Sequence, residues 1–388
     1  MEKTLPEIIE SVLDPALEKA AIRSADPVKT MSREKHEDAL CAHYVWNNGE
    51  QSVFLCPNAA ERGTVFTSLE EALKTHPELG EKIAELEGSD KDDPFAQKLC
   101  PLSESEVVLY IPQKMSQKRE FLVDVELSDA DRAALCKVFV IIDDEASAVV
   151  TLNLHSRGAN TENLFAGLFY CSVGSHAHLV LNEVQDLGLK TVCVRRKKTI
   201  VKESGDFHWN VCELGCAETC DSLDVEMKGK DSSAIVYGLY FPAGEQKMRM
   251  LTRQDHMVPH TYSNLHYKGA LTDNASARWE GMVYVDPEAG QADGYQKNET
   301  LMLSDTAKIF AKPGLEIITD DVKCSHGTTI TNIDDDQIFY LTSRGIPERE
   351  AEKLVIRGFF DTILNLITYT PIRGKLQDKI DSKMQEGE

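Results

Sequence analysis

The apolar residues in the middle of this chain come in short β-branched runs and do not follow helical spacing. Eight such runs lie between Lys137 and Thr329: Val138–Ile142, Val149–Leu154, Leu179–Leu181, Thr191–Val194, Ile235–Tyr240, Met282–Val285, Leu301–Leu303 and Leu315–Ile318. Runs of this length and composition are typical of strands. No convincing amphipathic helix flanks them, which argues against a doubly wound α/β sheet. The middle of the chain is therefore predicted to be mainly β.

A short turn unit recurs between these runs, with Asp, Gly or Pro first, then one residue, then Ala. It occurs at Asp144–Ala146, Gly215–Ala217, Asp273–Ala275, Pro287–Ala289 and Asp305–Ala307, and in longer form at Gly174–Ala177 and Asp231–Ala234. The first residue supplies turn chemistry, and the Ala is small enough for a tight corner. Repetition of one turn-and-strand unit indicates stacked coils. The irregular intervals also allow a sandwich of Greek-key sheets.

Both ends of the chain are predicted to contain helices. Ile8, Ile9, Val12, Leu13 and Leu17 recur near helical spacing. Further along, Ser68 with Glu71 forms a capping box for a helix at Leu69–Lys74, and Asp93 with Pro94 begins another. Ser52–Leu55 and Val107–Ile111 are extended runs between these helices.

After Thr329 the pattern becomes helical again. Asp334 caps a helix at Asp335–Ser343, Gly345 stops it, and Pro347 begins the next. The second helix carries an apolar stripe of Ala351, Leu354, Val355, Phe359, Ile363 and Leu366, and the charged tail beyond Gly374 is expected to fray. The predicted domains are a mixed, mainly helical region at 1–136, the β core at 137–329 and a helical domain at 330–388.

The composition limits the partners and the compartment. The chain has 42 Lys+Arg against 64 Asp+Glu, a formal net charge of −22, which repels nucleic acid and anionic membrane surfaces. No apolar run approaches the roughly 20 residues that span a bilayer. The acidic start, Met1–Glu7, is unlike a signal peptide. We therefore expect a cytoplasmic protein with no nucleic-acid or membrane partner, whose ten cysteines are mostly reduced.

Several Cys and His groups invite a metal interpretation. Cys212, Cys216 and Cys220 have a spacing unlike that of zinc ribbons or common ferredoxins, so a structural role is the prediction and a metal site the alternative. His256, His260 and His266, with Pro259 among them, are expected to be structural hydrogen-bonding residues. His176 and His178 would share a strand face. The chain contains no GxxxxGK[ST] phosphate loop, so it is not an ATPase.

Cys324 and His326 form the most suggestive pair. They lie two residues apart after the apolar run Leu315–Ile318, so in a strand they point to the same face. A thiolate beside an imidazole suits iron, an iron–sulfur cluster or zinc. On the pair alone, a buried free Cys beside a hydrogen-bonded His is the commoner outcome.

Longer segments around this pair resemble a known family. The segments are DHMVPHTYSNLHYKGAL at 255–271, YQKNETLMLSDTAKIFAKPGLEI at 295–317, DDVKCSHGTT at 320–329 and IDDDQIFYLTSRGIPEREAEKLVIRGFF at 333–360. In this order they resemble motifs of the SufB/SufD family, the scaffold subunits of the SUF iron–sulfur cluster assembly machine. The similarity is closest over the last third of the chain, and CSHG follows the SufD-type pattern.

The resemblance implies a right-handed parallel β-helix core and a scaffold without catalysis of its own. His326, with Cys324 beside it, would help to build a transient iron or iron–sulfur cluster site at the interface with a SufB-type paralogue. The Cys of the paralogue falls on Asn298 here, so that ligand is missing. Family complexes are also associated with reduced flavin and, indirectly, with a cysteine desulfurase system.

The resemblance further implies that the C-terminal helical domain docks a SufC-type ABC ATPase, whose motion would expose the ligands. The residues that match this surface are Phe339, Tyr340, Arg344, Gly345, Ile346, Glu350 and Phe359. Two alternatives stay open. One is a standalone homodimeric scaffold, which would have to work without a Cys at position 298. The other, from a different class, is a β-helix polysaccharide lyase or hydrolase, although most of these act outside the cell.

Overall fold

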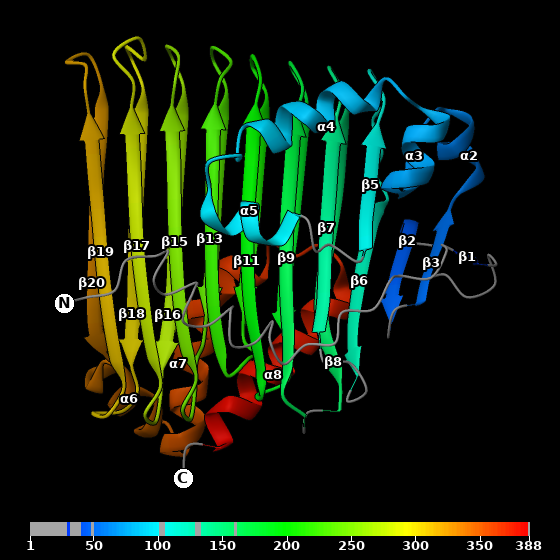
Figure 1. The fold of residues 1–388 in the computed structure, drawn as a ribbon. Helices are drawn as coiled ribbons and strands as arrows, with labels where there is room; N and C mark the ends of the chain where they lie inside the picture. The colour runs from blue at the N-terminus through cyan, green and yellow to red at the C-terminus, as the bar shows by residue number, and fades with distance from the viewer. Residues whose placement is uncertain are drawn as a thin grey trace.

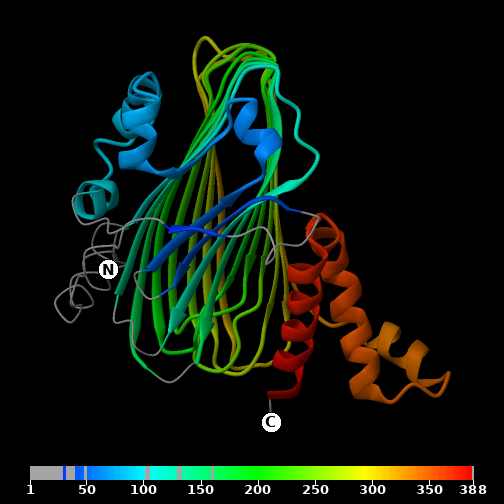
Figure 2. The same cartoon turned by 90° about the vertical axis from the view of Figure 1, so that its right-hand side faces the viewer.

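The computed structural model describes residues 29–31, 40–47, 50–100, 105–128, 133–158 and 161–386. The predicted helix at Ile8–Leu17 lies outside these residues. Most of the described chain consists of strands that alternate between two facing sheets, and helices lie on the outer faces of both (Figure 1, Figure 2).

The two sheets contain 11 and 9 strands. Sheet A contains, in order, β1 (Lys29–Thr30), β3 (Glu50–Leu55), β2 (Leu40–Asn47), β6 (Glu120–Ser128), β8 (Ser147–Arg157), β10 (His178–Asp186), β12 (Asp206–Glu213), β14 (Ser233–Tyr240), β16 (Tyr262–Leu271), β18 (Asp293–Met302) and β20 (Lys323–Asn332). Sheet B contains β4 (Val65–Ser68), β5 (Ser105–Ile111), β7 (Ala133–Ile142), β9 (Asn163–Val173), β11 (Thr191–Val201), β13 (Glu218–Met227), β15 (Lys247–His256), β17 (Ser276–Val285) and β19 (Lys308–Ile317).

Each coil contributes one strand to each sheet and lies in parallel register on the next coil. For example, His178 of β10 faces Asp206 of β12, and Thr191 of β11 faces Asn163 of β9. Greek-key sheets would be antiparallel, so the structure is a parallel β-solenoid and the sandwich alternative is wrong. All eight predicted strand runs fall on strands of these coils, apart from an end residue of the last two.

Residues along each strand alternate between the interior of the coil and the outside. In β15, Met248 and Met250 are buried while Arg249 and Leu251 are half-exposed. The inward side chains of both sheets make one continuous apolar cluster that runs from Cys41 to Ala307. This alternation explains why polar residues occur inside strands whose apolar runs look short in the sequence.

The turns from sheet B to sheet A form a second ladder along the stack. In these turns from β5–β6 to β17–β18 one residue has a positive φ, including Glu145 at 57° and His176 at 55°, whereas the last turn, between β19 and β20, has none. The N–H of Glu145 donates to the carbonyl of Ser175 in the next coil over 2.8 Å, and the N–H of His176 donates to Glu203 over 2.8 Å. The Ala residues that follow, such as Ala146 and Ala177, are buried at the corners. The predicted turn unit is thus confirmed as the corner of a coil.

The two ends of the solenoid differ. At the N-terminal end, β3 pairs antiparallel with β2, and β4 pairs antiparallel with β5. At the other end, β19 and β20 pair only with β17 and β18 among the described strands. Within the described part of the chain, the last coil therefore leaves one strand edge of each sheet without a strand partner.

Helices near the N-terminus lie beside sheet B. They are α2 (Pro57–Glu61), α3 (Leu69–Thr75), α4 (Leu79–Gly88) and α5 (Pro94–Leu99). The predicted caps are confirmed, since Ser68 accepts from the N–H of Glu71 and Asp93 accepts from the N–H groups of Phe95 and Ala96. The last two helices pack on β9 and β11 through Ile83, Leu86 and Phe95 and reach Cys220 of β13, so among the described residues no helix lies on the outer face of β15 to β19 (Figure 1).

The C-terminal helices are α6 (Asp335–Thr342), α7 (Glu348–Leu364) and α8 (Thr370–Glu386). The predicted cap Asp334 accepts from the N–H of Asp336, and Gly345 has a φ of 87°. Figure 2 shows α7 and α8 against the outer face of sheet A. The buried face of α7 consists of Ala351, Ile356, Phe360, Ile363 and Leu364. The predicted stripe was therefore partly wrong, because Leu354 is 46% exposed.

The prediction of a frayed tail beyond Gly374 is wrong. Leu376 and Ile380 of α8 are buried in the same cluster as Leu239 and Ala270 from the outer face of sheet A. Only a narrow apolar stripe of this helix touches the sheet, and the rest of its surface carries many charged residues. For this reason the sequence looks like a charged tail. The parallel pair β2–β6 lies wholly upstream of position 136, and β5 pairs with β7 residues from this position onward. The predicted division into domains stays a prediction.

The packing of α8 can be tested with a buried and an exposed residue of the same helix. Replacing Ile380 by Ala should lower the free energy of unfolding by about 2–5 kcal/mol, because it leaves a cavity under the helix. The matched exposed change Gln377→Ala should alter it by less than about 0.5 kcal/mol. Denaturant unfolding measures both, and equal effects would mean that α8 is not docked.

Candidate functional site

Cys324 and His326 lie on the last strand of sheet A and face the same way. In β20, Cys324 is in register with Gly294 of β18, and His326 is in register with Gln296. Both Gly294 and Gln296 are buried and face the interior of the coil. Because no described strand follows β20, the corresponding positions of the last coil are open: Cys324 is half-buried and His326 is exposed.

The Cys324 thiol sits in a small apolar pocket at one corner of the last coils. It packs against the cluster of Val283, Val285, Ala289 and Ala292. Burial raises the pKa of this thiol above its usual value. The thiol is therefore protonated at neutral pH until a cation or a metal ion approaches it.

Gly294 provides the space for this arrangement. A Cβ at this position would lie 3.2 Å from Sγ of Cys324, 3.2 Å from Nε2 of His256 and 3.1 Å from Cγ1 of Val283. His256 is the last residue of β15, and the sequence alone does not reveal that it lies near Cys324. His256 and Cys324 come close because the coils between them have the lengths that place both side chains beside Gly294.

His256 is held by hydroxyl groups on both ring nitrogens. Nδ1 lies 2.7 Å from Oγ1 of Thr261, and Nε2 lies 2.8 Å from Oγ of Ser263. Burial lowers the pKa of His256 to about 4, so the ring is neutral at neutral pH. These contacts support the predicted structural role. His266 likewise bonds Glu299 over 2.5 Å, and the backbone of His260 belongs to the turn ladder.

Cys324 and His326 alone would not complete a metal site. Among residues 29–386, apart from the short stretches that the structure leaves out, no group of three or more Cys, His, Asp or Glu side chains is placed to hold a metal ion. Zinc and iron–sulfur centres usually take four protein ligands. A stable centre at this pair would need ligands from another chain.

Exposed large apolar side chains gather at the same end of the molecule. Of the ten in the described chain, all but Leu189 follow residue 261: Tyr262, Tyr295, Phe310, Ile317, Ile318, Ile330, Phe339, Tyr340 and Leu354. We call the free edges of β19 and β20 with Phe310, Ile317, Ile318 and Ile330 the end surface. Exposed apolar groups next to free strand edges mark an interaction site.

The predicted ATPase-docking residues divide into exposed and packed ones. Phe339 is 72% exposed and Tyr340 56%, and the guanidinium of Arg344 lies 4.4 Å from the Tyr340 ring centre. Gly345 and Glu350 are also exposed, and Ile346 is half-buried. Phe359 instead packs on Phe360, and Nζ of Lys268 lies 4.7 Å from its ring centre.

Comparison with known proteins identifies the family of this chain. The family model "SUF system FeS cluster assembly, SufBD core domain" matches residues 125–359, more than half of the 388-residue chain. The chain belongs to the SufBD family.

Individual relatives place this SufBD protein near SufD. It is 26% identical over 368 residues to "Iron-sulfur cluster assembly protein SufD" of Bacillus subtilis, which covers 93% of this chain and 83% of the relative. It is 37% identical over 254 residues to a SufBD family protein of Mycobacterium tuberculosis, with 63% of each chain covered. It is 30% identical over 174 residues to SufD of Escherichia coli, with 45% and 41% covered. The protein is therefore SufD-like.

The three clustered cysteines of this SufBD protein do not share a site. Cys212 packs under the C-terminal helices, Cys216 faces the interior of the coils, and Cys220 lies under the helices on sheet B. Because the three belong to separate packing clusters, they cannot bind one metal ion. The structural interpretation is supported.

The histidine at position 178 has a partner that the sequence does not reveal. Its Nδ1 lies 2.8 Å from Oδ2 of Asp206, and Nε2 of His208 lies 3.3 Å from Oδ1 of the same carboxylate. These two hydrogen bonds lower the pKa of Asp206. His176 lies in the preceding turn with a positive φ. The prediction that it shares a strand face with His178 is therefore wrong.

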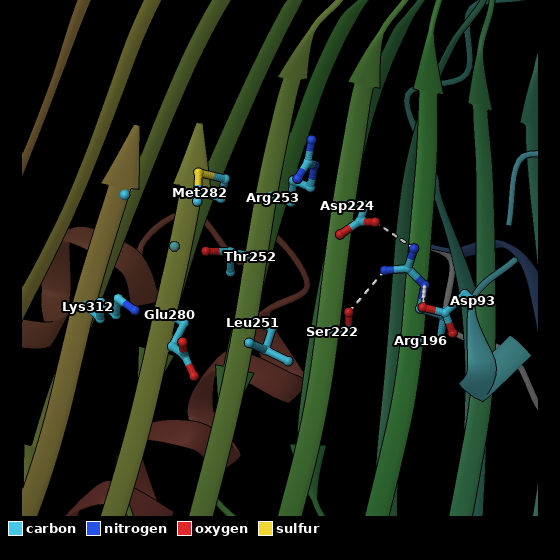
Figure 3. A pocket seen from close by; sticks show the side chains of 12 residues that line it. Asp93, Arg196, Ser222, Asp224, Leu251, Thr252, Arg253, Glu280, Met282 and Lys312 are labelled. Carbon is cyan, nitrogen blue, oxygen red and sulfur yellow. Dashed lines mark hydrogen bonds and ion pairs between the residues drawn. The ribbon is translucent and has the colours of Figure 1, made fainter. Parts of the chain in front are cut away.

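A hollow of about 340 Å³ lies on the outer face of sheet B and extends from Asp93 at the start of α5 to Lys312 of β19 (Figure 3). Its arginines are already paired, since Arg196 bonds Asp224 over 2.6 Å and Arg253 bonds Asp255 over 2.7 Å. Leu251 and Met282 add apolar surface. Nothing in this hollow singles out a flavin, and flavin binding stays a prediction. Among the described helices of this SufBD protein, none is long and apolar enough to cross a membrane.

The tight fit around Cys324 can be tested at Gly294. Gly294→Ala should lower the free energy of unfolding by about 1–3 kcal/mol, because the added methyl group overpacks the corner. It should also make the Cys324 thiol react faster with a thiol reagent, because the side chain must shift. Gly290→Ala is the matched control, since its Cβ would meet no atom within 4 Å. Similar behaviour of both variants would contradict the described packing.

Proposed function

We propose that this SufD-like protein is a non-catalytic cytosolic scaffold that completes an iron–sulfur assembly site by pairing with another chain through its end surface. The observation that carries the proposal is the position of Cys324 and His326 at the open end of the solenoid. Each faces the coil interior, but on the last coil no further strand of the described residues closes this interior. A partner that covers the end surface would bring its own ligands to the pair.

The partner that best fits is a SufB-type paralogue. The free edges of β19 and β20 offer backbone donors and acceptors to another strand, and the apolar residues beside them favour burial. A second copy of this chain is the alternative partner. Because Asn298 stands where the paralogue has a Cys, and its side chain is buried and bonded to Tyr240, a homodimer would supply fewer thiolates.

Iron and sulfide are the cargo in this proposal. The Cys324 thiol and the exposed His326 ring are soft and intermediate donors that suit iron. Arrival of a cation beside the raised-pKa thiol would release its proton and create a thiolate ligand. The sulfide would come indirectly from a cysteine desulfurase.

We further propose that α6 and the start of α7 dock a SufC-type ABC ATPase. All the side chains of α6 are at least partly exposed, which is unusual for a helix that carries Phe339 and Tyr340. By contrast, the inner faces of α7 and α8 are occupied by sheet A. Removing all C-terminal helices would expose that face of the sheet, so substitutions on α6 give a cleaner test than truncation.

The role of His326 can be tested in the complex reconstituted with the candidate paralogue and ATPase. His326→Ala should leave folding and complex formation intact, but iron and acid-labile sulfide per complex should fall several-fold because a ligand is lost. Ser325→Ala is the matched control, since this exposed neighbour points to the opposite face of β20. Full cluster content in His326→Ala would remove this residue from the site.

The docking surface can be tested on the intact chain. The double change Phe339→Ala and Tyr340→Ala should weaken ATPase binding at least tenfold, because exposed aromatic residues dominate such interfaces. Leu189→Ala removes a similarly exposed apolar residue from a distant turn and should have no effect. Calorimetric titration with the ATPase measures both. Unchanged affinity of the double variant would place the ATPase elsewhere.

A further inference from the structure

Two cysteines face each other at the end of the solenoid opposite to the end surface. Sγ of Cys41 lies 3.2 Å from Sγ of Cys56, and the N–H of Cys56 donates to the carbonyl of Cys41 over 2.9 Å. They extend the antiparallel register of β2 and β3, in which Ala42 faces Leu55. Opposed residues of antiparallel strands have Cα atoms about 4.5 or 5.5 Å apart, which lies within the range of disulfides.

The local structure directs both side chains to the same point. Along β2 and β6, Leu40 faces Glu120 and Ala42 faces Phe121, so Cys41 occupies a bulge without an opposite residue. Bulges of this kind turn a side chain away from its regular direction. Cys56 is the residue that precedes Pro57 at the start of α2. The pair is therefore fixed by a strand irregularity on one side and a helix start on the other.

The two thiols differ in access. Cys41 is fully buried, whereas Cys56 is half-buried. Burial raises the pKa of Cys41, and the positive charge of Arg119 opposes this rise. A small oxidant can therefore reach Cys56 more easily, and the buried Cys41 is placed to act as the resolving thiol.

We propose that Cys41 and Cys56 form a reversible intramolecular disulfide when the protein meets a hydroperoxide. The Cys56 thiolate attacks the terminal peroxide oxygen, the O–O bond breaks, and hydroxide leaves a sulfenic acid on Cys56. The Cys41 thiol then gives up its proton and attacks Sγ of Cys56, and the S–O bond breaks with release of water. The two thiols lose two electrons in total, and hydrogen peroxide is reduced to two waters. A dithiol reverses the step by exchange.

A second pair in the same chain provides an internal comparison. Cys193 and Cys216 also lie within reach of each other, but both are fully buried in the coils. Cys100 and Cys324 are half-buried, as Cys56 is, but the Cys100 thiol contacts Glu87 and Lys137, and Cys324 packs against an apolar cluster. Proximity together with access therefore singles out Cys41 and Cys56.

Formation of this bond would link the start of α2 to β2 and fasten the first hairpin. The end surface lies at the opposite end of the stack. Oxidation should therefore raise the melting temperature of the chain, because the cross-link constrains the unfolded state. It should leave pairing at the end surface unchanged.

The test uses the purified full chain, reduced and then treated with hydrogen peroxide. Free thiols are blocked with N-ethylmaleimide in denaturant, disulfides are reduced, and the released thiols receive a second, heavier maleimide. A protease that cuts after glutamate separates the two cysteines at Glu50. We expect the heavy label on Cys41 and Cys56 in equal amounts, its loss after dithiothreitol, and none on Cys193 or Cys216.

Single variants separate the two steps. In Cys41→Ser, Cys56 should be trapped as a sulfenic acid that reacts with dimedone, and in Cys56→Ser, Cys41 should keep the light label. Cys100→Ser should behave as the unchanged chain does. The proposal is overturned if peroxide leaves Cys41 and Cys56 with the light label, or if the heavy label reflects dimers on a non-reducing gel. If a variant does not fold, the labelling of the unchanged chain still shows whether Cys41 and Cys56 form a disulfide.

Discussion

A coil of a parallel solenoid satisfies its backbone hydrogen bonds only through its neighbours, and the rest of this structure depends on that constraint. Strand pairing and the turn ladder, such as Glu145 to Ser175 and His176 to Glu203, join each coil to the next. The first coils are closed by the antiparallel strands β3 and β4. No such closure follows β19 and β20 in the described chain, so the free edges, the apolar residues of the end surface and the Cys324–His326 pair all occur on the last coil.

The interior of the stack fixes this geometry with charge as well as with apolar packing. Arg195 and Lys197 of β11 point inward and are fully buried with Glu183, Glu213 and Asp221. Arg195 bonds Glu183 over 2.6 Å, and Lys197 bonds Asp221 over 2.8 Å. Burial raises the pKa of Glu213. A register slip of one residue would expose these groups or leave them unpaired. The network therefore specifies a single register, although an apolar core of the same volume could be equally or more stable.

Much of this fold could be predicted from the sequence because the same types of residue, Asp, Gly or Pro followed by Ala, recur at the turns of successive coils. Asp144, Asp273 and the Ala residues that follow them lie at turns as expected. The strands themselves were predicted too short. Inward positions that hold Arg195, Lys197 or Asp221 look like solvent-exposed residues until the ionic partners from neighbouring coils are known. The end of the chain was misjudged for a related reason, since the apolar stripe of α8, with Leu376 and Ile380, is narrow and its neighbours are charged.

The candidate site was predictable only in part. The i, i+2 spacing of Cys324 and His326 and the similarity to SufD-type motifs identify the pair, and the register of β20 confirms that both face one side. The approach of His256 to Gly294, and the paired carboxylate of Asp206 between His178 and His208, depend on residues that lie far apart in the sequence. Their contacts follow from coil lengths, which vary along the stack and which local patterns do not encode.

Hydrogen exchange at the end surface tests the central claim most directly. Backbone amides of β19 and β20 should exchange quickly in the isolated chain and become protected when the SufB-type paralogue is added, while β7 to β11 stay unchanged. Protection that appears elsewhere on the chain, with β19 and β20 unaffected in a stable complex, would contradict the account.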